Sequence, residues 1–162
     1  MDSLPLFHSW PLYEALAKLG FSPSSDVDPN FVARLKSTDT SEKTLAMQGV
    51  GVWACDLADE KLSWSPEVHQ LFGLPEDEPV TRAFTASRYE AGSRRVMERL
   101  RAYAIEHRRG FTMDAMIRRA DGDLRWMRLR AVPVLRADKV VRLTGTKQDI
   151  TAEYDGPGWR GF

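Results

Sequence analysis

The single cysteine, Cys55, and two of the three histidines, His69 and His107, could ligate a metal or act as a nucleophile beside a cavity. Haem iron needs an axial ligand, which a histidine on a helix beside a cavity can supply. Both histidines fall in segments of helical spacing, where a partly exposed histidine is the ordinary outcome. His107 near a helix end would also compensate the helix dipole. We therefore expect no haem at either histidine, and we interpret Cys55 as a small core residue.

The motifs that assemble known catalytic sites are absent from the sequence. It contains no His-Glu-x-x-His, P-loop, Gly-x-Ser-x-Gly or paired-cysteine metal spacing. The glycines Gly49 and Gly51 lead into an expected strand, whereas dinucleotide-binding glycines follow one. Asp56 and Asp114 are the acidic residues nearest to an expected cavity, and both can face water. We expect no catalytic residue, no metal site and no enzyme, and we rank a small enzyme that uses the cavity as the last alternative.

A ligand pocket between helices and a sheet is the best functional candidate. Ten side chains at apolar positions of the expected elements could line it: Val68, Leu71, Phe72, Leu100, Tyr103, Phe111, Met113, Met127, Leu129 and Leu143. Large flexible methionines suit a small apolar ligand, but they also suit gap-filling in a closed core. The sequence does not distinguish a ligand pocket from a filled core.

The elements that must position these residues follow from periodicity and turn signals. Residues 50–57 alternate as a strand, and residues 61–64 return as a second one. Ser65-Pro66 begins a helix that ends at Gly73, residues 76–92 suggest short helical turns, and Ser93 caps a long helix that ends at Gly110. Residues 111–117, 124–135 and 140–150 are strands, the first two joined by an Asp121-Gly122 turn. This order predicts an α+β domain with one antiparallel sheet covered by helices.

The ends of the chain differ from this central part. Residues 1–48 predict short amphipathic helices, none long enough to be stable alone, so they must dock on another surface. We therefore divide the chain into an N-terminal helical extension, 1–48, a domain, 49–151, and a short C-terminal tail, 152–162. Trp159 and Phe162 in the tail suit a docking peptide, and equally a mobile terminus.

Several short stretches, in this order, resemble the PAS family of bacterial sensor proteins with a closing PAC motif. They are Gly51-Val52-Trp53-Ala54-Cys55-Asp56-Leu57, Leu62-Ser63-Trp64-Ser65-Pro66-Glu67, Leu71-Phe72-Gly73-Leu74, Arg118-Arg119-Ala120-Asp121-Gly122, Arg125-Trp126 and Gly145-Thr146-Lys147-Gln148-Asp149-Ile150-Thr151. The resemblance covers nearly two thirds of the chain. It implies a five-stranded antiparallel sheet with helices on one face, and a signalling role for Trp126, Asp149, Ile150 and Thr151.

Two departures from the family pattern bear on function. The Asn-Cys-Arg-Phe-Leu-Gln run of flavin photosensors is absent, so the resemblance implies no flavin here. The His-Pro-Asp-Asp-Arg-like stretch that usually precedes the long helix is replaced by Tyr89-Glu90-Ala91-Gly92-Ser93-Arg94. No output domain follows the closing motif, so we expect a stand-alone signalling module.

Composition and charge limit the compartments and the partners that the protein can have. A single cysteine and the lack of a signal peptide fit a cytoplasmic protein, and no apolar run could span a membrane. Residues 1–80 carry 5 basic and 13 acidic residues, and residues 81–162 carry 18 and 10. Without a nucleic-acid motif, we interpret this asymmetry as two halves that face each other. We expect a homodimer through the N-terminal helices and the sheet face, an unidentified signalling protein as partner, and a small apolar ligand. The alternative is a constitutive dimerisation or adaptor domain without a ligand.

Overall fold

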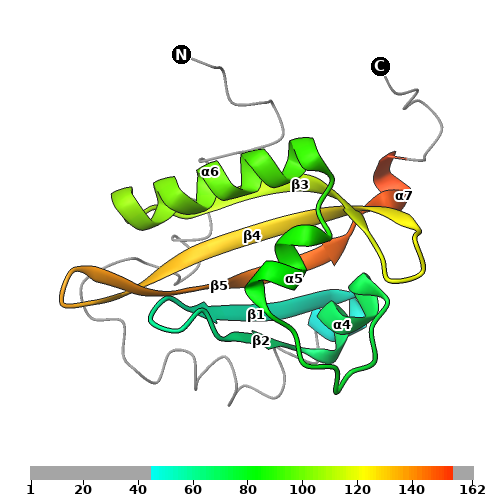
Figure 1. The fold of residues 1–162 in the computed structure, drawn as a ribbon, viewed down its shortest axis with the longest axis horizontal. Helices are drawn as coiled ribbons and strands as arrows, with labels where there is room; N and C mark the ends of the chain where they lie inside the picture. The colour runs from blue at the N-terminus through cyan, green and yellow to red at the C-terminus, as the bar shows by residue number, and fades with distance from the viewer. Residues whose placement is uncertain (1–44, 155–162) are drawn as a thin grey trace.

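The computed structural model describes residues 45–154 as one sheet with helices packed on it (Figure 1). The strands are β1 (Val50–Asp56), β2 (Leu62–Trp64), β3 (Phe111–Arg118), β4 (Leu124–Arg136) and β5 (Lys139–Asp149). The helices are α4 (Pro66–Phe72), α5 (Arg82–Ser87), α6 (Ala91–His107) and α7 (Thr151–Tyr154). The strand and helix order expected from periodicity is therefore confirmed over this range.

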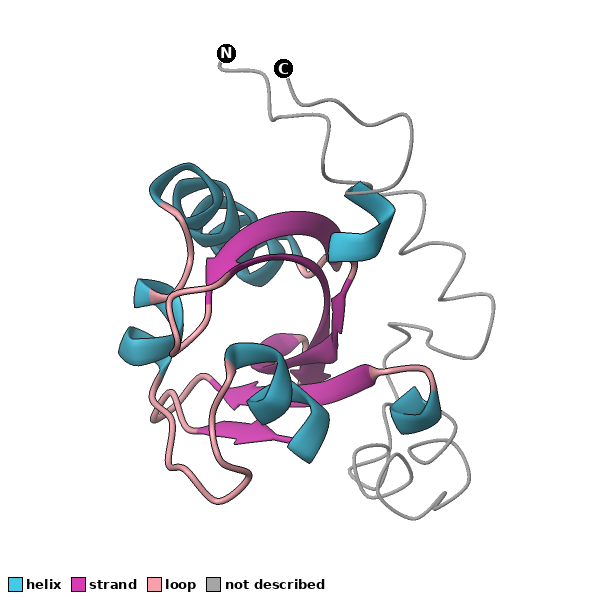
Figure 2. Cartoon of the chain, turned by 90° about the vertical axis from the view of Figure 1, so that its right-hand side faces the viewer, coloured by secondary structure: helices cyan, strands magenta, loops and turns pink. Residues whose placement is uncertain are grey.

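The sheet is antiparallel throughout and has the order β2-β1-β5-β4-β3. The last strand of the described residues, β5, is thus the central one, and it pairs Lys147 with Gly51 of β1 and with Leu129 of β4. The sheet is strongly curved; α4, α5 and α6 lie on its concave side, and α7 lies outside (Figure 2). This arrangement confirms the α+β fold class with helices on one face.

Helix α4 approaches strand β1 closely because residue 51 has no side chain. A Cβ atom built on Gly51 would overlap Val68 and would lie 2.8 Å from the Val68 backbone nitrogen. Ser65 precedes the helix as expected, but its hydroxyl does not cap it; Oγ instead accepts a hydrogen bond of 2.9 Å from the Val52 amide. The start of α4 is thereby fixed to β1.

The long helix begins earlier than expected. Its N-cap is Glu90, not Ser93, and the helix runs from Ala91 to His107. The Ser93 hydroxyl accepts a hydrogen bond of 2.9 Å from the Met116 amide of β3, so it holds the helix to the sheet instead of capping it. Within residues 76–92, α5 is capped by the Thr81 hydroxyl, which accepts a hydrogen bond of 3.1 Å from the Phe84 amide.

The expected helices of residues 1–44 and the tail residues 155–162, with Trp159 and Phe162, lie outside the described residues. Among residues 45–154, no helix is long and apolar enough to cross a bilayer.

Candidate functional site

A cavity of about 60 Å³ lies between the sheet and the helices α5 and α6. Strands β1, β4 and β5 contribute Trp53, Leu129, Leu143 and Lys147 to its wall, and the helical side contributes Tyr89 and other residues. The wall is mainly apolar, with a few polar groups, as is usual for small-molecule sites.

Lys147 is the most unusual residue of this wall. Its side chain points to the core side of β5 and is only 5% exposed. Its Nζ lies 5.4, 5.3 and 5.1 Å from the ring centres of Trp53, Trp64 and Phe72. Within residues 45–154, no carboxylate or carbonyl oxygen makes an ion pair or hydrogen bond with it. Burial therefore lowers the pKa of Lys147 to about 7, and the nearby Cys55 thiol opposes this only weakly.

Tyr89 and Cys55 add two further buried polar groups. Tyr89 is 7% exposed, and burial raises the pKa of its phenol. The Tyr89 hydroxyl makes no hydrogen bond with any described residue. Burial also raises the pKa of the Cys55 thiol, partly offset by the guanidinium of Arg101. The thiol is therefore neutral at pH 7, as its expected role as a small core residue requires.

The two arginines of the wall, in contrast to Lys147, are paired. Arg82 of α5 makes ion pairs with Glu98 and, at 3.8 Å, with Glu60. Arg101 of α6 lies 3.7 Å from the same Glu60 carboxylate, which is largely exposed. The two contacts with Glu60 join the second half of the chain to the first, whereas the Arg82–Glu98 pair lies within the second half.

The ten side chains expected to line a pocket divide into three groups. Phe111, Leu129 and Leu143 line the cavity. Six pack in the buried core instead: Val68, Leu71, Phe72, Leu100, Met113 and Met127. Tyr103 lies outside the core, because it is 42% exposed and its ring centre is 4.1 Å from that of His107, with the two rings tilted by 36°. Whether any of them contacts a ligand remains a prediction.

The face of α6 that packs on the sheet explains the error at Tyr103. The buried residues of the helix are Met97, Leu100 and Ala104. The small Ala104 is fully buried, whereas Tyr103 next to it turns toward solvent. Helical spacing alone does not distinguish the small buried Ala104 from the larger Tyr103 beside it.

Both histidines lie away from the cavity wall. His69 is buried, and its Nδ1 and Nε2 lie 3.2 and 3.1 Å from the carbonyl oxygens of Ser65 and Glu78. This geometry leaves no ring nitrogen directed at an iron. His107 is exposed at the end of α6. No group of three or more Cys, His, Asp or Glu side chains that could hold a metal ion occurs in the described part of the chain.

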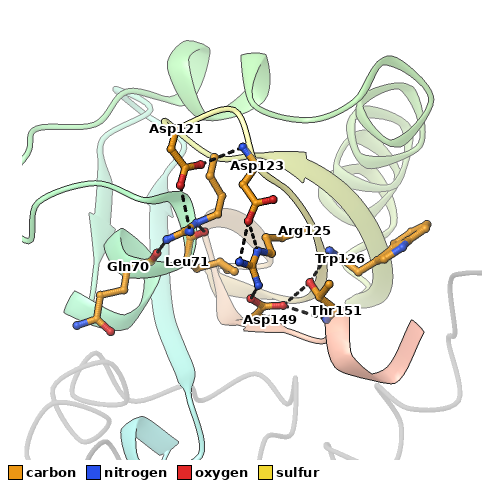
Figure 3. A network of polar contacts seen from close by, with 9 residues as sticks. Gln70, Leu71, Asp121, Asp123, Arg125, Trp126, Asp149 and Thr151 are labelled. Atoms are coloured by element: carbon orange, nitrogen blue, oxygen red, sulfur yellow. Dashed lines mark hydrogen bonds and ion pairs between the residues drawn. The ribbon is translucent and has the colours of Figure 1, made fainter. Parts of the chain in front are cut away.

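Three of the four residues expected to carry a signal, Trp126, Asp149 and Thr151, meet where β5 ends and α7 begins (Figure 3). The Thr151 hydroxyl donates a hydrogen bond of 2.6 Å to Asp149 and accepts one of 3.0 Å from the Trp126 amide. The Ile150 amide donates to the Trp126 carbonyl, and the Ile150 side chain is buried. The Trp126 ring stacks on Tyr154 of α7 at 4.3 Å.

A series of polar contacts links the junction of β5 and α7 to the end of α4 (Figure 3). Arg119 donates hydrogen bonds of 3.2 and 3.0 Å to the carbonyl oxygens of Leu71 and Gln70. Its guanidinium lies 3.5 Å from Asp121, which accepts a bond from the Asp123 amide. The chain continues from Asp123 to Arg125, at 2.7 Å, and from Arg125 to Asp149, at 3.7 Å.

Comparison with known proteins agrees with this geometry. The sequence matches the family described as PAS fold over residues 61–147. A sensory box histidine kinase/response regulator from Burkholderia thailandensis is 18% identical, with a TM-score of 0.60 over 70% of this chain and 86% of that one. The N-terminal domain of a diguanylate cyclase with a PAS/PAC sensor from Marinobacter aquaeolei is 19% identical, with a TM-score of 0.60 over 65% and 98%.

Light-sensing proteins are also among the similar structures. The LOV domain of a blue-light activated histidine kinase from Erythrobacter litoralis is 23% identical, with a TM-score of 0.51 over 62% of this chain and 95% of that one. A cavity of about 60 Å³ holds only a handful of heavy atoms, at roughly 10–15 Å³ for each buried water, far fewer than a flavin has, so it does not enclose a flavin in this conformation. No curated protein matches the chain.

Proposed function

Since this chain belongs to the PAS-fold family, we propose that it is a cytoplasmic signalling module that binds a small ligand in the cavity and passes the signal to a protein partner. In this proposal it works as a homodimer through its N-terminal segment and the outer face of the sheet, and it catalyses no reaction. Fold alone does not establish these functions. They rest on the cavity and on the contacts that lead out of it.

The observation that carries the proposal is Lys147, which lines the cavity and whose buried ammonium has no ion-pair or hydrogen-bond partner among residues 45–154. Buried polar groups are nearly always hydrogen-bonded, so a group without a partner calls for an explanation. An ammonium kept in place only for stability would be replaced favourably by an apolar side chain of similar length. A ligand with an acceptor atom accounts for the lysine and for the cavity together.

The polar chain from α4 to α7 supplies a route for the signal. Phe72 of α4 packs on the Lys147 ammonium, and the adjacent carbonyl of Leu71 accepts a hydrogen bond from Arg119. A ligand that draws the ammonium away from Phe72 would disturb α4 and, through Arg119, the ion pairs that end at Asp149. The proposed effect is a shift between two populations of α7, docked and released.

A constitutive adaptor domain without a ligand is the second candidate. The observation in its favour is the packing of Val68, Leu71, Phe72, Leu100, Met113 and Met127, which fills most of the space expected for a pocket. In that case the remaining cavity would hold only ordered water, which is common at buried polar groups.

Native mass spectrometry of the freshly purified protein, with an absorption spectrum of the same sample, separates the two candidates. A dimer that carries extra mass supports the ligand sensor, and the mass narrows down the compound. A colourless dimer without extra mass, which also gains none from a panel of cell metabolites, supports the adaptor. A monomer contradicts the dimer in both proposals.

A further inference from the structure

We propose that the cavity is a binding site for a small monocarboxylate of the size of acetate or propionate, held by the Lys147 ammonium and the Tyr89 hydroxyl. This inference rests on the proposed ligand-binding function and specifies the chemistry of its ligand.

The hydrogen-bonding capacity of the wall is the first argument. Lys147 and Tyr89 are 5% and 7% exposed, and neither has a hydrogen-bond acceptor among residues 45–154. The other polar groups of the wall are already engaged: the Thr85 hydroxyl donates to the Thr81 carbonyl at 2.9 Å, and Arg82 and Arg101 have carboxylate partners. Lys147 and Tyr89 therefore offer two buried donors that no described residue uses. A carboxylate supplies two acceptor oxygens without adding donors of its own.

The charge of the wall is the second argument. The cations Arg82 and Arg101 are matched by the carboxylates of Glu98 and Glu60. When Lys147 is protonated, its single positive charge is left uncompensated. A monoanion neutralises this charge, whereas a dianion would bring an uncompensated negative charge into a mainly apolar site, which is costly.

The size of the cavity is the third argument. A buried water needs roughly 10–15 Å³ of such volume, so a cavity of about 60 Å³ holds only a handful of heavy atoms. Apolar residues such as Trp53, Leu129 and Leu143 form much of the wall, so the remainder of the ligand is a short hydrocarbon. Acetate and propionate meet both conditions.

The pH dependence of binding gives a signature of the lysine. Cys55, Tyr89, Arg82 and Arg101 share the cavity with Lys147. Burial raises the pKa of the thiol and of the phenol and lowers the pKa of Lys147 to about 7. Lys147 is therefore the group of the wall that changes charge near neutrality. Because the charged form binds the anion, affinity falls by roughly thirtyfold between pH 6 and pH 8.5.

Isothermal titration calorimetry of the full chain with sodium propionate tests the proposal, with propionamide as the neutral probe of the same shape. We expect propionate to bind at pH 6, more weakly at pH 8.5, and propionamide at least tenfold more weakly than propionate. Lys147→Met abolishes propionate binding, and Tyr89→Phe weakens it about tenfold, the loss of one hydrogen bond to a charged group. Lys139→Met, at an exposed lysine of the same strand, leaves it unchanged.

Circular dichroism shows whether each variant is folded, and Tyr89→Phe, which keeps the shape of the wall, tests the site should Lys147→Met fail to fold. Equal binding of propionate and propionamide, or propionate binding that Tyr89→Phe and Lys147→Met leave intact, overturns the proposal. The absence of propionate binding at pH 6 also overturns the proposal.

If native mass spectrometry then still finds a neutral ligand, the sensory function stands and only its ligand class is wrong. If neither is found, both proposals fail.

Discussion

The Lys147 ammonium lies 5.1 Å from the centre of the Phe72 ring, deep between the central strand and helix α4. Two more aromatic rings, the indoles of Trp53 and Trp64, also lie close to the ammonium. Aromatic faces attract a cation by about 0.5–2 kcal/mol, which is less than the several kcal/mol that burial of an ammonium costs. A charge in this position therefore reduces the stability of the fold, which is consistent with a functional role.

Replacement of Lys147 should make the protein more stable near neutral pH. The pKa of Lys147 is lowered to about 7 in the folded state and is about 10.4 in the unfolded chain. Between these values the unfolded state binds one more proton, so the free energy of unfolding rises with pH, by up to about 1.4 kcal/mol per pH unit. Below pH 7 the full cost of the buried charge is present. In Lys147→Met both the cost and this slope disappear.

Urea unfolding of the wild type and of Lys147→Met at pH 6, 7, 8 and 9 measures this difference. The variant should be more stable at pH 6 by a few kcal/mol, and the two curves should converge toward pH 9. Parallel curves would mean that Lys147 titrates as an ordinary lysine.

Removal of the Arg119 guanidinium should loosen the end of α4. Its two hydrogen bonds to the Gln70 and Leu71 carbonyls are lost in Arg119→Gln, at a cost of about 1–2 kcal/mol. Hydrogen exchange should increase at the amides of α4 and, if the polar chain couples the two sites, also at α7. Arg136→Gln, at an exposed arginine, is the control. Faster exchange confined to α4 would contradict the proposed route.

Gly51→Ala should be strongly destabilising, because a methyl group at this position would collide with Val68 at the start of α4. Overpacking of this kind costs about 1–3 kcal/mol. Gly92→Ala, in helix α6, is the matched control, because a Cβ atom built on Gly92 would lie 3.9 Å from the nearest side-chain atom, Nη2 of Arg95. Alanine also favours a helix over glycine by about 0.5–1 kcal/mol. Thermal melting measures both, and a neutral Gly51→Ala would contradict the close contact.

The anchoring of α7 can be tested with the same substitution at two threonines, Thr151 of α7 and Thr146 of β5. Thr151→Val removes the bond that the hydroxyl donates to Asp149 and the bond that it accepts from the Trp126 amide, so α7 should exchange its amide hydrogens faster. The bond from the Thr151 amide to Asp149 remains. The buried Thr146 hydroxyl has no hydrogen-bond partner in the described structure, so Thr146→Val should leave stability unchanged or raise it. Equal effects of the two variants would show that α7 is not anchored by Thr151.

The fold was largely predictable because local signals agreed with the tertiary structure. Alternation in residues 50–57 and the glycine at the end of α4, whose φ is 72°, each indicate one local conformation. Ser93 was less informative, because a serine near a helix start suits a cap as well as a contact to a neighbouring strand. Only the structure shows that its partner is the Met116 amide.

The candidate site was predictable only in part. Phe111, Leu129 and Leu143 are apolar and follow the strand period, but Lys147 was missed because a lysine in a strand normally faces solvent. Its position held a usable signal: it lies four residues after Leu143 and pairs with Leu129, so it shares their face of the sheet. Tyr89 and Arg101 reach the wall through tertiary packing, which sequence periodicity does not contain.

The most direct test of the account is an NMR titration of the Lys147 side chain in protein labelled at its six lysines, with Lys147→Met to assign the signal. We predict a pKa of about 7 for the free protein and a higher one with saturating propionate, because the bound carboxylate favours the charged form. A pKa that stays near 10.4, with or without propionate, would show that Lys147 is neither desolvated nor part of a binding site.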